Sequence, residues 1–305
     1  MADSHYHAGH AAKGADSGAG DIGGAMAATG RIDSHLHLWD LAPGQYSWLK
    51  PEMGVLYDSF TAAQAHKVLS GAGVGRAILV QADDTAADNH ALLAAAQAND
   101  WIIGVVGWLP LEEPAKAAAL LEEFRENPKF CGVRTLLHDD PRADVLEFDS
   151  VRQTLALLAG AGIAFDVPNA FPRHLGQVAQ LAKDFPELRI VVDHMAKPPR
   201  GDAAAMIQWE SQLRAVAALP NTVAKMSGLH ADGAEFSARA LAQVWDVALE
   251  AFGPQRIMFG GDWPVSLLGA SYVETVAVAQ SLIDPLSAAE AQAIWAGTSL
   301  ATYYP

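Results

Sequence analysis

The sequence contains little that would suit a disulfide framework, a nucleic-acid partner or a membrane. Among its 305 residues there is one cysteine, Cys131, which excludes an internal disulfide and a multi-cysteine zinc or iron–sulfur site. Basic residues number 20 against 35 acidic ones, a net charge of −15, which argues against binding to nucleic acid or anionic membrane surfaces. No apolar run approaches the roughly 20 residues of a membrane span. The composition therefore indicates a cytoplasmic protein with neither kind of partner.

The first 30 residues differ in composition from the rest of the chain. They are rich in glycine and alanine, contain no aliphatic run, and lack the basic start and continuous apolar stretch of a secretory signal. We expect a flexible, disordered tail over residues 1–30 because this segment has too little apolar surface to pack. Hydrophobic residues form 51% of the whole chain and charged residues 18%, which is enough for a large core. Residues 31–305 are expected to form one domain.

After residue 30, short apolar runs alternate with longer helical patterns. Runs such as AILV, IIGVVGW, RIVV and RIMF are nearly continuous, which is typical of parallel strands covered by helices. The expected strands are 31–37, 76–81, 102–108, 132–136, 163–167, 189–194, 222–227 and 256–261. The expected helices are 61–70, 86–99, 114–126, 150–158, 173–184, 203–219, 235–252 and 288–296.

The loop after the first strand distinguishes between two α/β architectures. A doubly wound dinucleotide-binding sheet would place a GxGxxG loop there, but the sequence has SHLHLWD. The one glycine-rich stretch that resembles such a loop, GAGVG at 71–75, precedes a strand and therefore stands in the wrong order. The pattern of alternating strands and helices thus predicts an α/β fold of the (β/α)8 TIM-barrel type.

Polar residues stand where several of these strands end, which is where a barrel builds its active site. The first strand ends in His35 and His37, and the period of two directs both side chains to one face. His194 ends the sixth strand and Asp262 follows the eighth. Imidazoles with a carboxylate can bind zinc or a similar ion, and the carboxylate can deprotonate water. We predict His35, His37, His194 and Asp262 as metal ligands, with Asp262 and His194 as catalytic residues.

The order of short motifs also carries a family resemblance. RIDSHLHLWD, YSWL, GVRTLL, FDVPNAFPRHL, DHMAKP, KMSGL and RIMFGGDWPV closely resemble the amidohydrolase superfamily from about residue 31 to the C-terminus. The match is to the amidohydrolase 2 branch, which contains sugar-lactone hydrolases of the L-fuconolactonase and L-rhamnonolactonase type. The resemblance implies an amidohydrolase-like barrel whose strand-one histidine pair binds a divalent metal in many relatives, and whose strand-eight aspartate activates the hydrolytic water.

The sequence departs from the two-metal pattern of that superfamily at two strands. No lysine suited to carbamylation is evident at the end of strand four, where GVRTLLHDD stands. Strand five carries Asp166 where many metal-dependent relatives have a histidine. We therefore expect no more than one zinc-like ion per chain, and an activity that need not depend on it.

Five further residues are assigned to substrate binding, each with a structural alternative. Arg134 would orient the lactone carbonyl or a hydroxyl, or form a salt bridge inside the barrel. Trp48 would form an apolar wall for a sugar ring or pack within its loop, and Trp108 ends strand three. Asp166 would accept a sugar hydroxyl or serve as a substitute ligand, and Lys197 would donate to the substrate or pair with the protein.

The predicted function is hydrolysis of the ester ring of a small, neutral sugar lactone to the aldonate by water that Asp262 activates. Neutrality is expected because Arg134 is the arginine at a strand end, whereas a dicarboxylate would require several. Two alternatives remain open: a metal-dependent decarboxylase of the same branch, and a non-catalytic barrel that binds a sugar acid. The expected partner is a lactone substrate, and the expected assembly is a monomer or small homo-oligomer.

Overall fold

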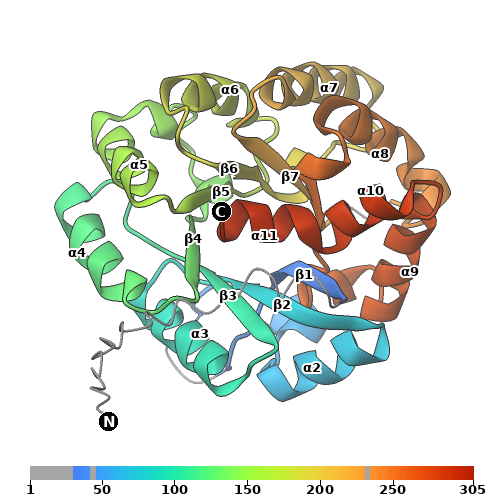
Figure 1. Ribbon diagram of the computed structural model, residues 1–305, viewed down its shortest axis with the longest axis horizontal. Coiled ribbons are helices and arrows are strands. Elements are labelled where there is room, and N and C mark those ends of the chain that lie inside the picture. Colours follow the sequence, from blue (N-terminus) through green and yellow to red (C-terminus); the bar gives the residue numbers. More distant parts are fainter. Residues whose placement is uncertain (1–29, 42–45, 231–233) are drawn as a thin grey trace, which may run out of the picture.

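Eight parallel strands form a closed barrel at the centre of the computed structural model, which describes residues 30–41, 46–230 and 234–305 (Figure 1). Neighbouring strands pair in the order β1 to β8, which confirms the predicted TIM barrel. The predicted tail over residues 1–30 lies outside the described residues except for its last one. The strands are β1 Arg31–Leu36, β2 Val74–Val80, β3 Ile102–Gly107, β4 Phe130–Arg134, β5 Ala164–Val167, β6 Ile190–Val192, β7 Thr222–Met226 and β8 Ile257–Phe259.

The first and last strands meet through backbone hydrogen bonds that close the barrel. The His37 amide donates to the Trp263 carbonyl over 2.8 Å, and the Asp262 amide donates to the His35 carbonyl, also over 2.8 Å. This close approach requires glycine at position 260, since a Cβ there would lie 2.7 Å from the His35 Cβ. Barrel closure thus places the HLH and GGDW segments side by side, although they are far apart in the sequence.

Helices cover the barrel from outside, and local sequence signals fix several of their ends. Thr61 and Gln64 form a reciprocal capping box at the start of α2, and Gly162 ends α5 in the left-handed conformation. Within the described residues, no helix combines the length and apolar character needed to cross a membrane. The outer helices are α2 Ala62–Gly71, α3 Ala86–Ala98, α4 Pro114–Arg125, α5 Asp149–Ala161, α6 Leu175–Asp184, α7 Ala203–Ala217, α8 Ala238–Phe252 and α9 Tyr272–Ile283.

The region after β8 differs from the sequence prediction. Helix α9 was not expected, although Ser271 and Glu274 form a capping box at its start, which is a signal readable from sequence. The single helix expected over 288–296 is instead a continuous helical segment with a π-helical turn in it. That segment comprises α10 Ala288–Gln292, the π-helical turn Ala293–Gly297 and α11 Thr298–Tyr303.

Helix α11 crosses the middle of the barrel in Figure 1 and covers the end at which the strands begin. The Tyr304 hydroxyl, just after this helix, donates to the Ile103 carbonyl near the start of β3. Tyr303 packs inside the barrel with Ile78, Val106 and Met258. Because this end is filled by apolar side chains and a helix, the opposite end, where the strands finish, is the one available to a ligand.

Candidate active site

A cavity of about 370 Å³ opens where the strands end. Its volume is in the range of small-molecule sites. Six of the nine residues predicted for the site line it: His37, Trp48, Arg134, His194, Lys197 and Asp262. The remaining three lie below or beside the cavity, and His35 among them is fully buried in its floor.

Strand β1 presents its two histidines to the barrel interior through an irregular register. The pairing with β2 shifts between Asp33 and Leu36, a span that contains His35, and the rings of His35 and His37 lie with their centroids 4.9 Å apart. His37 Nδ1 lies 2.9 Å from the Val80 carbonyl, which can only accept, so Nδ1 carries the proton. The other ring nitrogen, Nε2, lies 3.4 Å from Asp262 Oδ1.

Asp262 occupies a strained position beside these imidazoles. Its φ of +54° lies in the left-handed region that non-glycine residues avoid, a feature common at functional sites. Its Oδ1 also lies 3.8 Å from His35 Nε2, and its Oδ2 lies 3.8 Å from His230 Nε2. Burial alone would raise the pKa of Asp262, but the surrounding imidazoles, His194 first among them, outweigh burial and hold that pKa far below its usual value. Asp262 is thus an ionised acceptor.

His194 begins a run of four residues with positive φ that ends at Lys197. The imidazole fits because residue 228 is glycine: a Cβ there would lie 2.3 Å from His194 Nδ1. That nitrogen forms a 2.8 Å hydrogen bond with the Ser227 hydroxyl. Burial lowers the pKa of His194 to about 4, so the ring is neutral at pH 7. Lys197 lines the cavity while its ammonium donates to the Gly228 carbonyl over 2.8 Å.

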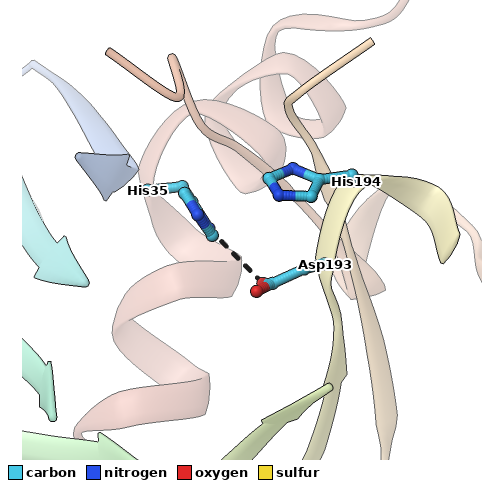
Figure 2. Close-up of side chains that lie close together, drawn as sticks. All are labelled: His35, Asp193 and His194. Atoms are coloured by element: carbon cyan, nitrogen blue, oxygen red, sulfur yellow. Dashed lines mark ion pairs between the residues drawn. The ribbon is translucent and has the colours of Figure 1, made fainter. Parts of the chain in front are cut away.

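Two overlapping clusters of metal-type donors share His35. One contains His35, Asp193 and His194, and the other contains His35, His37 and Asp262. Figure 2 shows the first of them, in which the Asp193 carboxylate lies against the His35 ring. The structure therefore does not gather the four predicted ligands in one cluster, because His194 groups with Asp193 instead of with His37 and Asp262.

The charges around Asp193 decide between the two clusters. Its Oδ1 lies 3.2 Å from the Lys225 ammonium, and its Oδ2 lies 3.3 Å from the Arg134 guanidinium. Both oxygens are thus already neutralised by protein cations, and a metal ion would be repelled there. Within the described residues, the charged partners of Asp262 are all histidines. Neither a lysine nor an arginine is among them.

The cluster of His35, His37 and Asp262 fits a single zinc-like ion. Its nitrogen-to-oxygen separations of 3.4 and 3.8 Å are close to the edge of a tetrahedron with zinc–ligand bonds, about 3.3–3.6 Å. The anchoring of His37 Nδ1–H on a backbone carbonyl is the usual support of a metal-bound imidazole. Two imidazoles and one carboxylate also leave a coordination position for water.

Below the cavity lies a polar layer that is closed to solvent. The Lys225 ammonium donates to Asp166 Oδ2 over 2.5 Å, and the Tyr303 hydroxyl donates to the same oxygen over 2.7 Å. Burial raises the pKa of Asp166 to about 6. Burial alone would lower the pKa of Lys225, but the charges of Asp166 and Asp193 outweigh it and raise that pKa. Asp166, predicted to meet a sugar hydroxyl, is instead fully buried and bound to protein donors.

Lys225 and Tyr303 are missing from the predicted site, for different reasons. A lysine inside an apolar barrel strand is itself a signal, because lysine is seldom fully buried without a partner. Tyr303 gives no such signal, since only the fold brings the end of the chain under the cavity. Arg134 forms the salt bridge predicted as its structural alternative, with Asp193, and it also lines the cavity, so its contact with the lactone stays a prediction.

The two predicted tryptophans lie in different places. Trp48 lines the cavity, and its indole N–H donates to the Ala82 carbonyl over 2.8 Å. Trp108 lines a separate cavity of about 240 Å³ beside Asp84. Asn89 fixes this arrangement, because its side-chain amide forms 2.7 Å hydrogen bonds with both backbone groups of Trp108.

Comparison with known proteins agrees with the architecture. The sequence profile of the amidohydrolase family matches residues 32–304. An L-fucono-1,5-lactonase of Burkholderia multivorans is 38% identical over 286 residues, which span 90% of this chain and 95% of that protein. An L-fucono-1,5-lactonase of Burkholderia ambifaria is 31% identical over 245 residues, 80% of this chain and 83% of that protein.

Solved structures extend the comparison to three dimensions. A crystal structure of an amidohydrolase from Burkholderia multivorans with bound zinc superposes with a TM-score of 0.82 at 33% sequence identity. The superposition covers 90% of this chain and 99% of that one. The family profile spans almost the whole described barrel, including the HLH and GGDW segments that form the cavity floor. The chain belongs to the amidohydrolase family.

Proposed function

We propose that the protein hydrolyses the ester ring of a small, neutral sugar lactone and releases the open-chain sugar acid. The observation that carries this proposal is the cluster of His35, His37 and the ionised Asp262 at the floor of a 370 Å³ cavity. Imidazoles with an ionised carboxylate can activate a water molecule for attack on an acyl carbon. The relative at 38% identity, named L-fucono-1,5-lactonase, supports a sugar lactone as the substrate class.

Asp262 is the proton acceptor in the proposed reaction. A water molecule attacks the lactone carbonyl carbon while its proton passes to the Asp262 carboxylate. The tetrahedral intermediate then collapses, the bond from the carbonyl carbon to the ring oxygen breaks, and the proton returns from Asp262 to that oxygen. Lactone and water thereby give one hydroxy acid, and Asp262 is regenerated.

Two cavity residues orient the substrate in this scheme. The guanidinium of Arg134 lines the cavity and is suited to stabilise negative charge developing on the carbonyl oxygen. Neutral His194 offers a hydrogen bond without placing a second cation in the cavity. Lys197 and Trp48 complete the proposed substrate contacts, with Lys197 directed to a hydroxyl group and Trp48 to the sugar ring.

The same floor would hold at most one divalent ion, bound by His35, His37 and Asp262. When bound, such an ion would polarise the carbonyl and lower the pKa of water towards about 7. The zinc in the crystal structure at 33% identity supports zinc as the ion. Lactones are activated esters, so the carboxylate of Asp262 is also proposed to retain activity without the ion.

The charge of the cavity favours a neutral substrate. Arg134 shares its positive charge with Asp193, and Lys197 is the other cation of the described lining. A dicarboxylate lactone would need a set of uncommitted bidentate arginines. The described lining therefore suits hydroxyl groups better than a second carboxylate.

The proposal is tested by a pH-indicator assay over a panel of aldono-1,4- and 1,5-lactones and dicarboxylate lactones. Protein is assayed as purified, after chelation and after zinc is restored, and elemental analysis counts the bound metal. We expect acceleration for neutral lactones, no more than one ion per chain, and residual activity after chelation. No acceleration with any lactone would exclude the function and leave decarboxylation or simple binding. Two tightly bound ions would overturn the ligand assignment and would make Asp166, and His138 of the cavity lining, candidates for the missing ligands.

A further inference from the structure

A continuous line of buried polar contacts leads from the C-terminal helix α11 to the cavity floor. The Tyr303 hydroxyl donates to Asp166 Oδ2 over 2.7 Å, and the Lys225 ammonium donates to the same oxygen over 2.5 Å. The same ammonium lies 3.2 Å from Asp193 Oδ1, which lies 3.4 Å from His35 Nδ1. Tyr303 is 4% exposed and the other four side chains are fully buried, so no water competes for these contacts.

Charged groups hold the His35 ring on both of its nitrogen-bearing sides. Nδ1 lies 3.3 Å from the Lys225 ammonium and 3.4 Å from Asp193 Oδ1, and Nε2 lies 3.3 Å from the Arg134 guanidinium. Lys225 therefore contacts His35 directly and also lies 3.2 Å from Asp193 Oδ1. The orientation of the ring, with Nε2 toward Asp262, thus depends on the position of the Lys225 ammonium.

Tyr303 matters because Asp166 has few other restraints. Asp166 Oδ1 has no hydrogen-bond partner among the described residues, so Oδ2 receives both donors. If the Tyr303 hydroxyl is removed, the Lys225 ammonium is the one side-chain donor to Asp166 that remains among the described residues. The carboxylate and the ammonium would then shift together, and Asp193 would lose its fixed partner.

We propose that Tyr303 is a positioning residue of the active site, which acts through Asp166, Lys225 and Asp193 to fix the imidazole of His35. The helix that covers the closed end of the barrel thereby helps to set the geometry of the floor. The inference rests on the proposed lactonase activity for its kinetic readout alone. A spectroscopic readout on His35 is independent of that activity.

The chain offers a matched pair of variants for the test. Tyr303→Phe removes the hydroxyl but keeps the ring, whose centroid lies 5.6 Å from the Lys225 ammonium. Tyr304→Phe removes the neighbouring hydroxyl, which is bonded to the Ile103 carbonyl outside this line of contacts. Each variant loses one tyrosine hydroxyl hydrogen bond, one to a carboxylate and one to a backbone carbonyl, so a purely structural role predicts a fall in melting temperature in both and equal kinetics.

Two measurements separate positioning from packing. We expect Tyr303→Phe to lower kcat about 10-fold with KM unchanged, at the lower end for partners that orient a site, and Tyr304→Phe to leave kcat unchanged. Nitrogen-15 spectra of histidine-labelled protein, with His35 assigned through a His35→Gln sample, should show a shifted Nδ1 signal in Tyr303→Phe only. Equal kcat and equal His35 spectra in the two variants would overturn the proposal.

The remaining outcomes are also decisive. If the wild-type protein opens no lactone, the proposed function fails while the His35 spectra still test the role of Tyr303. If Tyr303→Phe does not fold, Asp166→Asn breaks the same line of contacts with little change of shape, and it carries the same expectation for the His35 spectrum. An unchanged His35 spectrum in Asp166→Asn would refute the proposal that this line of contacts positions His35.

Discussion

The wall and the floor of the cavity are built on opposite principles. The wall comes from two loop segments, Pro51–Leu56 and Val265–Leu268, and contributes apolar side chains such as Met53, Leu56, Val265 and Leu268. Exposure reaches 52% at Leu268. The floor comes from strand ends and contributes charged or ionisable side chains that are almost fully buried. We therefore expect the loops, which tolerate change, to recognise the shape of the substrate, and the proposed chemistry to depend on the rigid barrel.

The difference extends to stability. In the floor, the carboxylates of Asp166 and Asp193 lie among the cations of Lys225 and Arg134, and all four side chains are buried. Buried charges are tolerated only when each keeps its partner, so removal of one partner costs far more than the pair contributes. The wall contains no such dependence, because removal of an apolar side chain leaves no uncompensated charge behind. Floor variants should therefore affect both activity and stability, whereas variants of the exposed part of the wall, at Leu268, should affect neither strongly.

The largest effect is expected from Asp262→Asn. The amide keeps the shape of the side chain but cannot accept the proton of water, so lactone turnover should fall by roughly 10²-fold or more. The assay is initial-rate kinetics on the best lactone of the panel, with circular dichroism to verify the fold. Asp100→Asn, at an exposed turn before β3, is the control and should retain full activity. Turnover of Asp262→Asn within a few-fold of wild type would remove this residue from the mechanism.

The next effect is a loss of stability in Lys225→Met. This change leaves Asp166 and Asp193 without their shared cation, and the free energy of unfolding should fall by about 3–5 kcal/mol. Urea denaturation measures the loss, and Lys183→Met on the exposed face of α6 is the control. Adding Asp166→Asn should recover part of the stability, because it restores the charge balance. A loss below about 1 kcal/mol, the scale of an exposed pair, would show that these charges are not confined to a dry floor.

The predictable part of the site is the part that strand periodicity controls. His35 and His37 follow from an alternating strand end, and Asp262 follows from its place after the last strand of a barrel. The structure brings these three together because Asp262 and His37 exchange backbone hydrogen bonds with the partner segment. Fold class could therefore be read from the sequence, and so could the edge of the barrel at which the polar residues gather.

The unpredictable part depends on contacts that no local pattern encodes. Tyr303 reaches Asp166 across 137 positions of the sequence, and only the closure of the barrel by α11 brings them together. Asp193 directly precedes His194 in the sequence, but nothing in the sequence indicates that His194 shares a donor cluster with Asp193 and not with His37. Trp108 was assigned to the cavity from its strand, but the side chain of Asn89 holds its backbone so that the indole lines another hollow.

The smallest effect is expected in the wall, from Leu268→Ala. Leu268 lines the cavity at 52% exposure, so substrate would cover only part of its side chain. At about 0.8 kcal/mol for each buried methylene, partial coverage is equivalent to roughly a fivefold rise in KM. Because this contact is the same for substrate and transition state, kcat should stay unchanged. Val273→Ala on α9, 56% exposed and outside the described cavity lining, is the matched control and should change neither constant. A fall in kcat at constant KM would contradict the division between wall and floor, since it would show that a loop side chain stabilises the transition state selectively.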